Sequence, residues 1–146
     1  MSVVKLVPEA FLPTKATPAA AGFDLFAVEE SFLEAWAVGL IRTGLRATPP
    51  VGCYLRITGR SGLTMEGLLV QTGVVDPDYT GELKIMAYNV SGDRFFIPKG
   101  LKVAQMVPER YAMNCAFLVQ SGDLVACNDS NAVSLRGTRG FGSSGY

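Results

Sequence analysis

Short apolar runs, closely punctuated by glycine and proline, are the feature that most restricts how this chain folds. The 146 residues include 16 glycines and 8 prolines, and no stretch shows a long helical periodicity. Many short strands separated by turn residues are typical of an all-β barrel or jelly roll. A chain of this length buries a sizeable core as one unit, so we expect a single domain over residues 1–146.

The apolar runs between these turn residues show where strands are expected. Their alternation with polar side chains predicts strands at residues 3–7, 23–27, 37–42, 53–58, 94–97, 101–107 and 111–119. Residues 29–36 fit either one helical turn or a loop, and residues 61–66 fit a single helical turn capped by Ser61. Residues 121–134 form a polar connection, and there is no internal repeat and no linker between domains.

An acid and an aromatic residue stand close together in residues 73–81, GVVDPDYTG. The apolar run Leu68–Val70 leads into this stretch and residues 82–89 lead out of it, so the pattern predicts a β-hairpin. The hairpin would hold the carboxylate of Asp76 beside the phenol of Tyr79. This pair is a candidate site, although an aspartate before a proline is more often part of a turn.

Two glycine-bearing stretches are candidates for binding phosphate. In residues 59–64, GRSGLT, backbone N–H groups, a hydroxyl and the Arg60 fork would form a cradle; a capped turn with a solvated arginine is the plainer interpretation. Residues 136–146, RGTRGFGSSGY, contain four glycines among eleven residues. They are either a disordered tail or an arm that folds over a ligand, with arginines on phosphates and Phe141 on a flat ring.

Composition excludes several classes of function. Lys+Arg and Asp+Glu both number 13, so no overall field favours nucleic acid or membrane partners. Without histidine, the chain has no His-based acid–base catalysis and no His-ligated zinc. Cys53, Cys115 and Cys127 form no CxxC pair, which favours free thiols in a reducing compartment, and we expect an intracellular protein, cytoplasmic or nuclear. No apolar run approaches the ~20 residues of a membrane span.

Five stretches, in this order, resemble the five motifs of the homotrimeric dUTPase (deoxyuridine 5′-triphosphate nucleotidohydrolase) family. They are AGFDLFA at 21–27, GRSGLT at 59–64, GVVDPDYTGE at 73–82, KGLKVAQMV at 99–107 and RGTRGFGSSG at 136–145. The resemblance covers essentially the whole chain. It departs at Gly59, where the family usually has proline, at Leu101 and Lys102, where it has an Asp-Arg pair, and at Arg139, where it has a small residue.

The resemblance implies a distorted, jelly-roll-like β-barrel that assembles as a homotrimer with composite sites. Residues 135–146 would be a flexible arm that closes over the active site. The implied reaction is hydrolysis of dUTP to dUMP and pyrophosphate by water attack at the α-phosphorus, which keeps uracil out of DNA and supplies dUMP for thymidylate synthesis. The implied cofactor is Mg²⁺, bound chiefly by the triphosphate, with Asp24 near its waters.

The resemblance also assigns roles to residues. Asp76 would orient and deprotonate the water, and Tyr79 would lie against the deoxyribose and leave no space for a 2′-hydroxyl. The backbone around Val74, Val75 and Lys84 would read the uracil edge. Arg136 would pair with the γ-phosphate, and Phe141 would stack on uracil. The remaining substrate contacts are expected from Arg60, Ser61, Gly62, Gly73, Gln105, Gly142 and Ser143.

Three alternatives remain open at this point. The first is a catalytically inactive module of the same fold that binds protein partners, which turnover of dUTP would exclude. The second is a dCTP deaminase of the same fold, whose chemistry needs an additional acid near the base and whose mark is ammonia release from dCTP. The third is a structural domain that binds no ligand.

Overall fold

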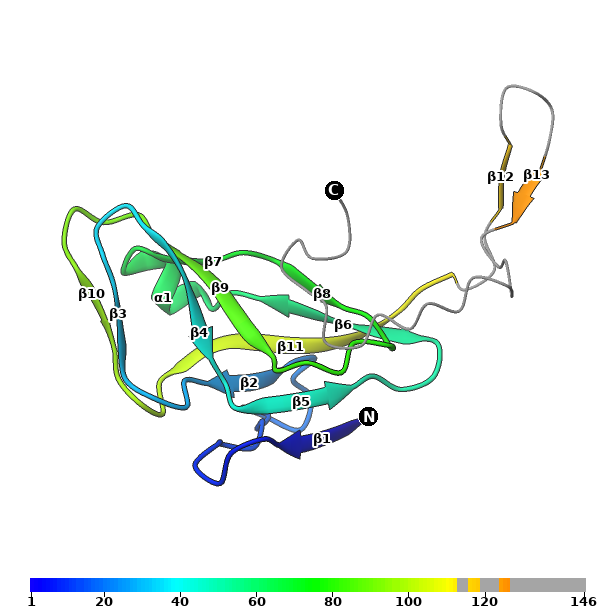
Figure 1. Ribbon diagram of the computed structural model, residues 1–146, viewed down its shortest axis with the longest axis horizontal. Helices are drawn as coiled ribbons and strands as arrows, with labels where there is room; N and C mark the ends of the chain where they lie inside the picture. Colours follow the sequence, from blue (N-terminus) through cyan, green and yellow to red (C-terminus); the bar gives the residue numbers. More distant parts are fainter. Residues whose placement is uncertain (113–115, 119–123, 127–146) are drawn as a thin grey trace.

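The structure, a computed structural model, describes residues 1–112, 116–118 and 124–126 and consists of short strands with one helical turn (Figure 1). In chain order the elements are β1 (Ser2–Lys5), β2 (Phe23–Phe26), β3 (Ser31–Leu33), β4 (Val38–Arg42), β5 (Leu45–Thr48), β6 (Cys53–Thr58), α1 (Ser61–Met65), β7 (Leu68–Val70), β8 (Gly73–Val75), β9 (Lys84–Asn89), β10 (Phe95–Ile97), β11 (Lys102–Arg110), β12 (Ala116–Leu118) and β13 (Leu124–Ala126). The prediction of an all-β chain is confirmed.

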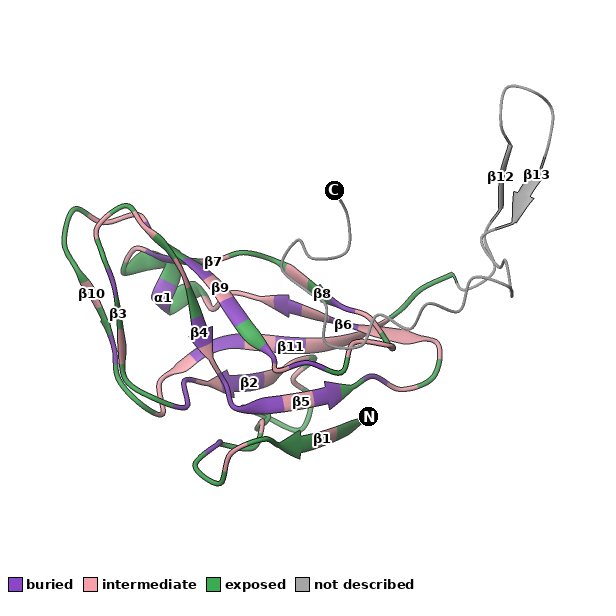
Figure 2. Ribbon diagram, viewed as in Figure 1, coloured by how far each residue is buried: buried purple, intermediate pink, exposed green. Residues whose placement is uncertain are grey.

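The strands pair into small antiparallel sheets. One sheet has four strands in the order β2-β11-β6-β8, and another has three in the order β4-β9-β7. The pairs β1–β5, β3–β10 and β12–β13 form two-stranded sheets. Among the described strands these sheets are separate ladders rather than one continuous closed barrel. The sheets formed by residues 1–112 share an apolar core (Figure 2).

The four-stranded sheet has an inner and an outer face because successive side chains alternate along each strand. Leu55 and Ile57 of β6, Met106 of β11 and Leu25 of β2 are buried on the inner face. The paired residues Asp24, Gln105 and Thr58 share the other, outer face. This division decides which side chains of the sheet can meet at one ligand.

The predicted pairing of residues 68–70 with residues 82–89 is confirmed: β7 pairs with β9, with Leu68 opposite Asn89. The stretch between them differs from a simple hairpin loop, because β8 pairs with β6, with Gly73 opposite Ile57. The chain therefore changes sheets between β7 and β8. Period-2 alternation marks a strand but does not name its partner, and for this reason the sequence did not predict the pairing of β8 with β6.

Four other local predictions differ from the structure. Residues 31–33 form strand β3 against β10 rather than a helical turn or loop, and residues 45–48, which were not predicted as a strand, form β5 against β1. The helical turn is present as α1, but its N-cap is Arg60, with no side-chain hydrogen bond, so the predicted Ser61 cap is wrong. β11 runs on to Arg110, and of the predicted strand 111–119 only residues 116–118 are a described strand.

A buried asparagine ties the far ends of three segments together. The Asn89 side chain, with no exposed surface, donates from Nδ2 to the carbonyl oxygens of Leu33 (3.2 Å), Glu34 (3.1 Å) and Asp93 (2.8 Å). Its Oδ1 accepts from the amide and the hydroxyl of Ser91, at 3.0 and 2.7 Å. Asn89 thus joins the end of β9 to β3 and to the loop that leads to β10.

Asn89→Ala should lower the free energy of unfolding by about 3 kcal/mol, because several buried hydrogen bonds worth about 1 kcal/mol each are lost together. Urea denaturation at fixed protein concentration measures this loss. Ser91→Ala, which removes one hydroxyl and leaves the Nδ2 contacts intact, is the control and should cost about 1 kcal/mol or less. Equal losses in the two variants would mean that Asn89 does not anchor the network.

Candidate functional site

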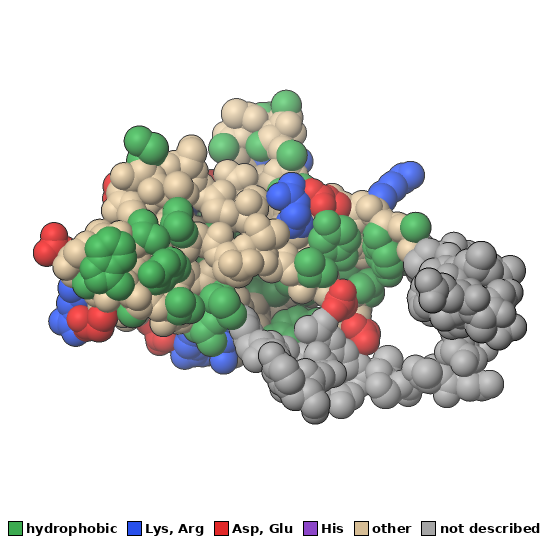
Figure 3. All heavy atoms as spheres, turned by 90° about the horizontal axis from the view of Figure 1, so that it is seen from above, with side chains coloured by type: hydrophobic (Ala, Val, Ile, Leu, Met, Phe, Trp, Pro, Cys, Tyr) green, Lys and Arg blue, Asp and Glu red, His purple; other side chains and the backbone are tan. Residues whose placement is uncertain are grey.

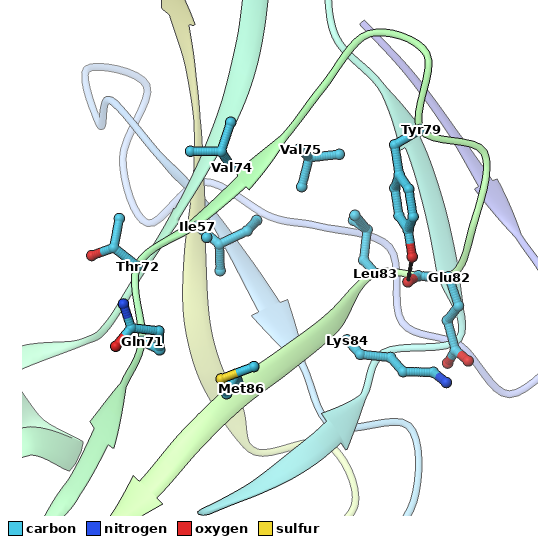
Figure 4. A pocket seen from close by; sticks show the side chains of 11 residues that line it. Ile57, Gln71, Thr72, Val74, Val75, Tyr79, Glu82, Leu83, Lys84 and Met86 are labelled. Carbon is cyan, nitrogen blue, oxygen red and sulfur yellow. Dashed lines mark hydrogen bonds between the residues drawn. The ribbon is translucent and has the colours of Figure 1, made fainter. Parts of the chain in front are cut away.

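A cavity of about 180 Å³ opens where the chain leaves the three-stranded sheet between β7 and β8 (Figure 4). The amide of Gln71 donates to the carbonyl oxygen of Met86 at 2.9 Å, and the chain then crosses to the four-stranded sheet. The gap is lined by β8 on one side and by the start of β9 on the other, with Tyr79 at one end. Five of the residues expected to bind substrate line this cavity: Gly73, Val74, Val75, Tyr79 and Lys84.

β8 faces this cavity with a strand edge. Within the described part of the chain, β8 pairs only with β6 and forms the last strand of its sheet. An edge strand presents N–H and C=O groups in alternation, and an extended or planar partner with the complementary order can bind there. The cavity wall can therefore read a flat ligand by its pattern of donors and acceptors.

Asp76 and Tyr79 stand at the two ends of one tight turn. The amide of Tyr79 donates to the carbonyl oxygen of Asp76 at 3.1 Å. This hydrogen bond closes the turn and keeps the two residues close in space. The Tyr79 hydroxyl donates to the carbonyl oxygen of Glu82 at 2.9 Å. Its ring lies over Gly81, where any Cβ would overlap the phenol, so glycine is required there. Tyr79 thus lines the cavity, and Asp76 directly follows Val75, another residue of its lining.

A second group of candidate residues surrounds the buried carboxylate of Asp24, which is 3% exposed. Lys102 Nζ lies 2.9 Å from Asp24 Oδ2, and Arg60 Nε lies 3.4 Å from Oδ1. Arg60 Nη1 also donates to the carbonyl oxygen of Lys102 at 3.2 Å. The three side chains come from β2, the end of β6 and the start of β11, and two positive charges meet one negative charge.

A bulge in β11 places Lys102 in this cluster. The β2–β11 register shifts between Lys102 and Ala104, which puts Lys102 opposite Phe26 and on the same face as Asp24. Lys102 stands where the sequence departs from the dUTPase motifs, and it retains a positive charge beside Asp24. On the molecular face seen in Figure 3, acidic and basic side chains are interspersed, so positive charge gathers only locally.

The cavity and the Asp24 cluster use opposite faces of the four-stranded sheet. Ile57 and Val75, whose side chains line the cavity, belong to the inner face. Gln105 pairs with both Asp24 and Thr58 on the outer face. The family resemblance assigns Arg60, Ser61 and Gly62 to phosphates bound by a neighbouring subunit. Within this chain, the cavity that contains Gly73 and Tyr79 is not lined by Asp24, Arg60, Ser61, Gly62 or Gln105.

The remaining predicted residues stand as follows. Ser61 and Gly62 are the first two residues of α1 and follow Arg60 directly. Arg136, Phe141, Gly142 and Ser143 lie outside the described residues, as does the whole arm 135–146. Within residues 1–112, 116–118 and 124–126, no group of three or more acids or cysteines could hold a metal ion, and no helix is long and apolar enough to cross a membrane.

Sequence reasoning missed Glu82, Gln71 and Met86. Gln71 and Met86 close one end of the cavity, and the Glu82 carboxylate, 14% exposed, binds the β4–β5 corner. A single glutamate after a turn glycine carries no signal of its own, and Gln71 and Met86 become important only through the pairing of β7 with β9. These three residues could be found only once the strand partners were known.

Lys102→Met should lower the free energy of unfolding by about 1 kcal/mol. One of the two cations beside a buried carboxylate is lost, but Lys102 is 40% exposed, so solvent screens much of the effect. Lys102→Arg should restore most of it. The exposed Lys99 provides the control, since Lys99→Met should be neutral in the same urea titration; equal losses at both lysines would refute a role for the Asp24 contact.

Comparison with known proteins gives a consistent picture. A family model described as dUTPase matches residues 9–145. The deoxyuridine 5′-triphosphate nucleotidohydrolase of Saccharomyces cerevisiae is 41% identical over 137 residues, which is 93% of this chain and 88% of that protein. The protein of the same name from fowl adenovirus A serotype 1 is 38% identical and covers 97% of this chain and 75% of its own length.

Solved structures with the same fold come from phages. The dUTPase from phage phi11 of S. aureus superposes with a TM-score of 0.77 at 25% identity, over 82% of this chain and 95% of that chain. A variant of the Staphylococcus bacteriophage 80alpha dUTPase with dUpNHpp covers 99% of this chain and 98% of its own, with a TM-score of 0.76 and 25% identity. A variant of the phi11 protein, also 25% identical with a TM-score of 0.76, coordinates a structural Mg(II) ion.

Proposed function

This chain belongs to the dUTPase family, and on that premise we propose that it hydrolyses dUTP to dUMP and pyrophosphate. The observation that carries the proposal is the exposed edge of β8, which lines a cavity together with Tyr79, whose turn begins at Asp76. In the cell this activity would keep uracil out of DNA and supply dUMP for thymidylate synthesis. An intracellular location, cytoplasmic or nuclear, follows from such a substrate.

The β8 edge is proposed to select uracil. Along one edge, uracil presents C=O, N–H and C=O, which complements the alternating N–H and C=O groups of an extended strand. Cytosine places an amino donor where uracil has a carbonyl acceptor, so a donor would face a donor. The backbone of Val74 and Val75 on one wall and of Lys84 on the other is available for this contact. A thymine methyl would clash with a wall this close.

Asp76 is proposed to be the general base. Its carboxylate takes a proton from water, the water oxygen bonds to the α-phosphorus, and the bond from that phosphorus to the bridging oxygen breaks to release pyrophosphate. An aspartate suits the task because its oxygens accept a hydrogen bond from water and then the proton. Tyr79 would lie against the deoxyribose and exclude a 2′-hydroxyl.

The phosphates are proposed to bind at the Asp24 cluster of a neighbouring subunit. Arg60, Ser61, Gly62 and Gln105 would neutralise and orient them, the main means of catalysis in phosphoryl transfer. Support comes from the lining of the cavity, which includes none of Asp24, Arg60, Ser61, Gly62 and Gln105 of the same chain. A homotrimer, typical of this family, supplies a second chain.

Mg²⁺ is proposed to arrive with the triphosphate, because the described residues fit this ion poorly. Asp24 is the carboxylate expected near the phosphates, and both of its oxygens lie beside cations. Its expected contact with magnesium-bound water stays a prediction, and its neighbours favour a role in holding Arg60. A hard cation that keeps several waters and binds substrate phosphates supplies charge neutralisation.

The arm 135–146 is proposed to complete the site, with Arg136 on the γ-phosphate, Phe141 on the uracil ring, and Gly142 and Ser143 on phosphate oxygens. Arginine and phosphate form charge-assisted hydrogen bonds, and an aromatic ring stacks on a flat base.

Among the alternatives, a dCTP deaminase needs a free acid near the base. Glu82 is the acid among the described residues that line the cavity, and Arg42 and Gly44 bind its carboxylate.

Asp76→Asn should lower kcat for dUTP by about 10²- to 10⁴-fold while dUTP still binds, because the amide keeps the shape but cannot accept the proton. A coupled pyrophosphate assay and titration calorimetry measure the two quantities. Asp78→Asn changes the neighbouring carboxylate of the same turn and should cost little. Similar losses in both variants would indicate that another group is the general base. A native protein that does not hydrolyse dUTP would favour the alternative of a module that binds protein partners.

Mixing Asp76→Asn and Arg60→Ala subunits should restore activity that neither variant has alone. Random assembly of a composite trimer would give about a quarter of the sites an intact Asp76 from one chain and an intact Arg60 from the next. Subunit exchange is followed by mass spectrometry of the mixed trimers. Mixed trimers without activity would show that one chain supplies both groups to its own site.

A further inference from the structure

We propose that Glu82 is a positioning residue that fixes Tyr79 and thereby sets the preference of the enzyme for 2′-deoxyribose. The inference rests on the proposed function, in which the Tyr79 ring lies against the sugar. Glu82 does not touch the substrate in this scheme. It acts through its own carbonyl oxygen, which receives the Tyr79 hydroxyl at 2.9 Å (Figure 4).

The Glu82 carboxylate is bound on the side away from the cavity. Oε1 accepts from the amide of Gly44 at 2.9 Å, and Arg42 Nε lies 3.2 Å from both carboxylate oxygens. Gly44 has a φ of +67°, and a Cβ there would crowd Val7, so the amide is held in a conformation that few other residues adopt. The 14% exposure of the Glu82 side chain shields these contacts from water.

The next residue is bound at the same corner. The Leu83 amide donates to the carbonyl oxygen of Leu45 at 2.7 Å, and the Thr43 hydroxyl donates to the carbonyl oxygen of Leu83 at 2.6 Å. Residue 82 is therefore held through its side chain, and residue 83 through its backbone. The Glu82 carbonyl between these contacts is a fixed acceptor for the Tyr79 hydroxyl.

A fixed acceptor matters because the ring must exclude a single oxygen atom. The Tyr79 side chain rotates about two bonds, and the missing Cβ of Gly81 lets its ring lie close to the backbone there. Holding the hydroxyl restricts both rotations and sets the plane of the ring. A ring that could shift by a fraction of an ångström would admit the 2′-hydroxyl of a ribonucleotide. Discrimination between deoxyribose and ribose therefore depends on the Glu82 carbonyl as well as on the Tyr79 ring.

The chain supplies a matched control on the same arginine. Arg42 Nη1 also contacts the carboxylate of Glu29 at 3.4 and 3.5 Å, and that side chain is 54% exposed. Glu29 contacts Arg42 through Nη1, whereas Glu82 contacts it through Nε. Glu29→Gln therefore makes the same chemical change as Glu82→Gln on the outer side of Arg42.

The experiment measures kcat/KM for dUTP and for UTP, which differ only in the 2′-hydroxyl. Glu82→Gln keeps an acceptor for Gly44 and weakens the Arg42 contact, and Tyr79→Phe removes the hydroxyl. Each should lower the dUTP:UTP ratio about fivefold, chiefly by raising the value for UTP, as the loss of about one hydrogen bond implies. The double variant should match Tyr79→Phe alone, because Glu82 acts through that hydroxyl. Glu29→Gln should leave the ratio unchanged.

An unchanged ratio in folded Glu82→Gln, or effects that add in the double variant, would overturn the inference. Circular dichroism establishes folding, and Arg42→Lys replaces Glu82→Gln if the latter does not fold. A native protein without dUTP turnover would refute the proposed hydrolysis instead. The dissociation constants of dUDP and UDP then measure the preference for deoxyribose in the same variants without catalysis. Equal affinities of the native protein for the two nucleotides would overturn the role of Glu82.

Discussion

The hydrogen bond from the Gln71 amide to the Met86 carbonyl is the contact on which the candidate site depends. It is the last contact of β7 with β9 before the chain crosses to pair with β6 as β8. Because β8 and β9 then belong to different sheets, a cavity opens between them and the β8 backbone faces it. The same crossing brings Tyr79, whose turn begins at Asp76, to the cavity. The pairing of the strands thus creates the cavity independently of any catalytic side chain.

Alternation along the four-stranded sheet accounts for the rest of the arrangement. The inner face supplies the apolar core and one wall of the cavity, whereas the outer face holds Asp24 with its two cations. Each group of residues is well ordered by its own contacts, with the Asp24 carboxylate almost fully buried. In the proposed function, the two groups belong to a site that is completed by a neighbouring subunit.

The sequence predicted features that depend on neighbours along the chain and missed those that depend on pairing. Strands such as residues 53–58, the helical turn after Arg60 and the glycine beneath Tyr79 have local causes, and they were found or can be rationalised locally. β5 was missed because LRAT alternates over only four residues between the Thr43-Gly44 turn and the prolines, and β1 is the partner that makes it a strand. Lys102 could be recognised as a departure from the motif, but its contact with Asp24 follows from a bulge that no local pattern reveals.

The Asp24 cluster has a consequence for how a ligand arrives. The chain carries equal numbers of acidic and basic residues, and the excess positive charge around Asp24 is confined to one small region. At physiological salt, charges separated by more than about 8 Å are largely screened from one another, so a triphosphate in solution meets almost no attracting field until it is nearly in contact. Encounter is then governed by diffusion. Discrimination among nucleotides then falls to the short-lived complex that forms afterwards. In the proposed function, the donors and acceptors of the β8 edge and the Tyr79 ring decide there whether a nucleotide stays bound.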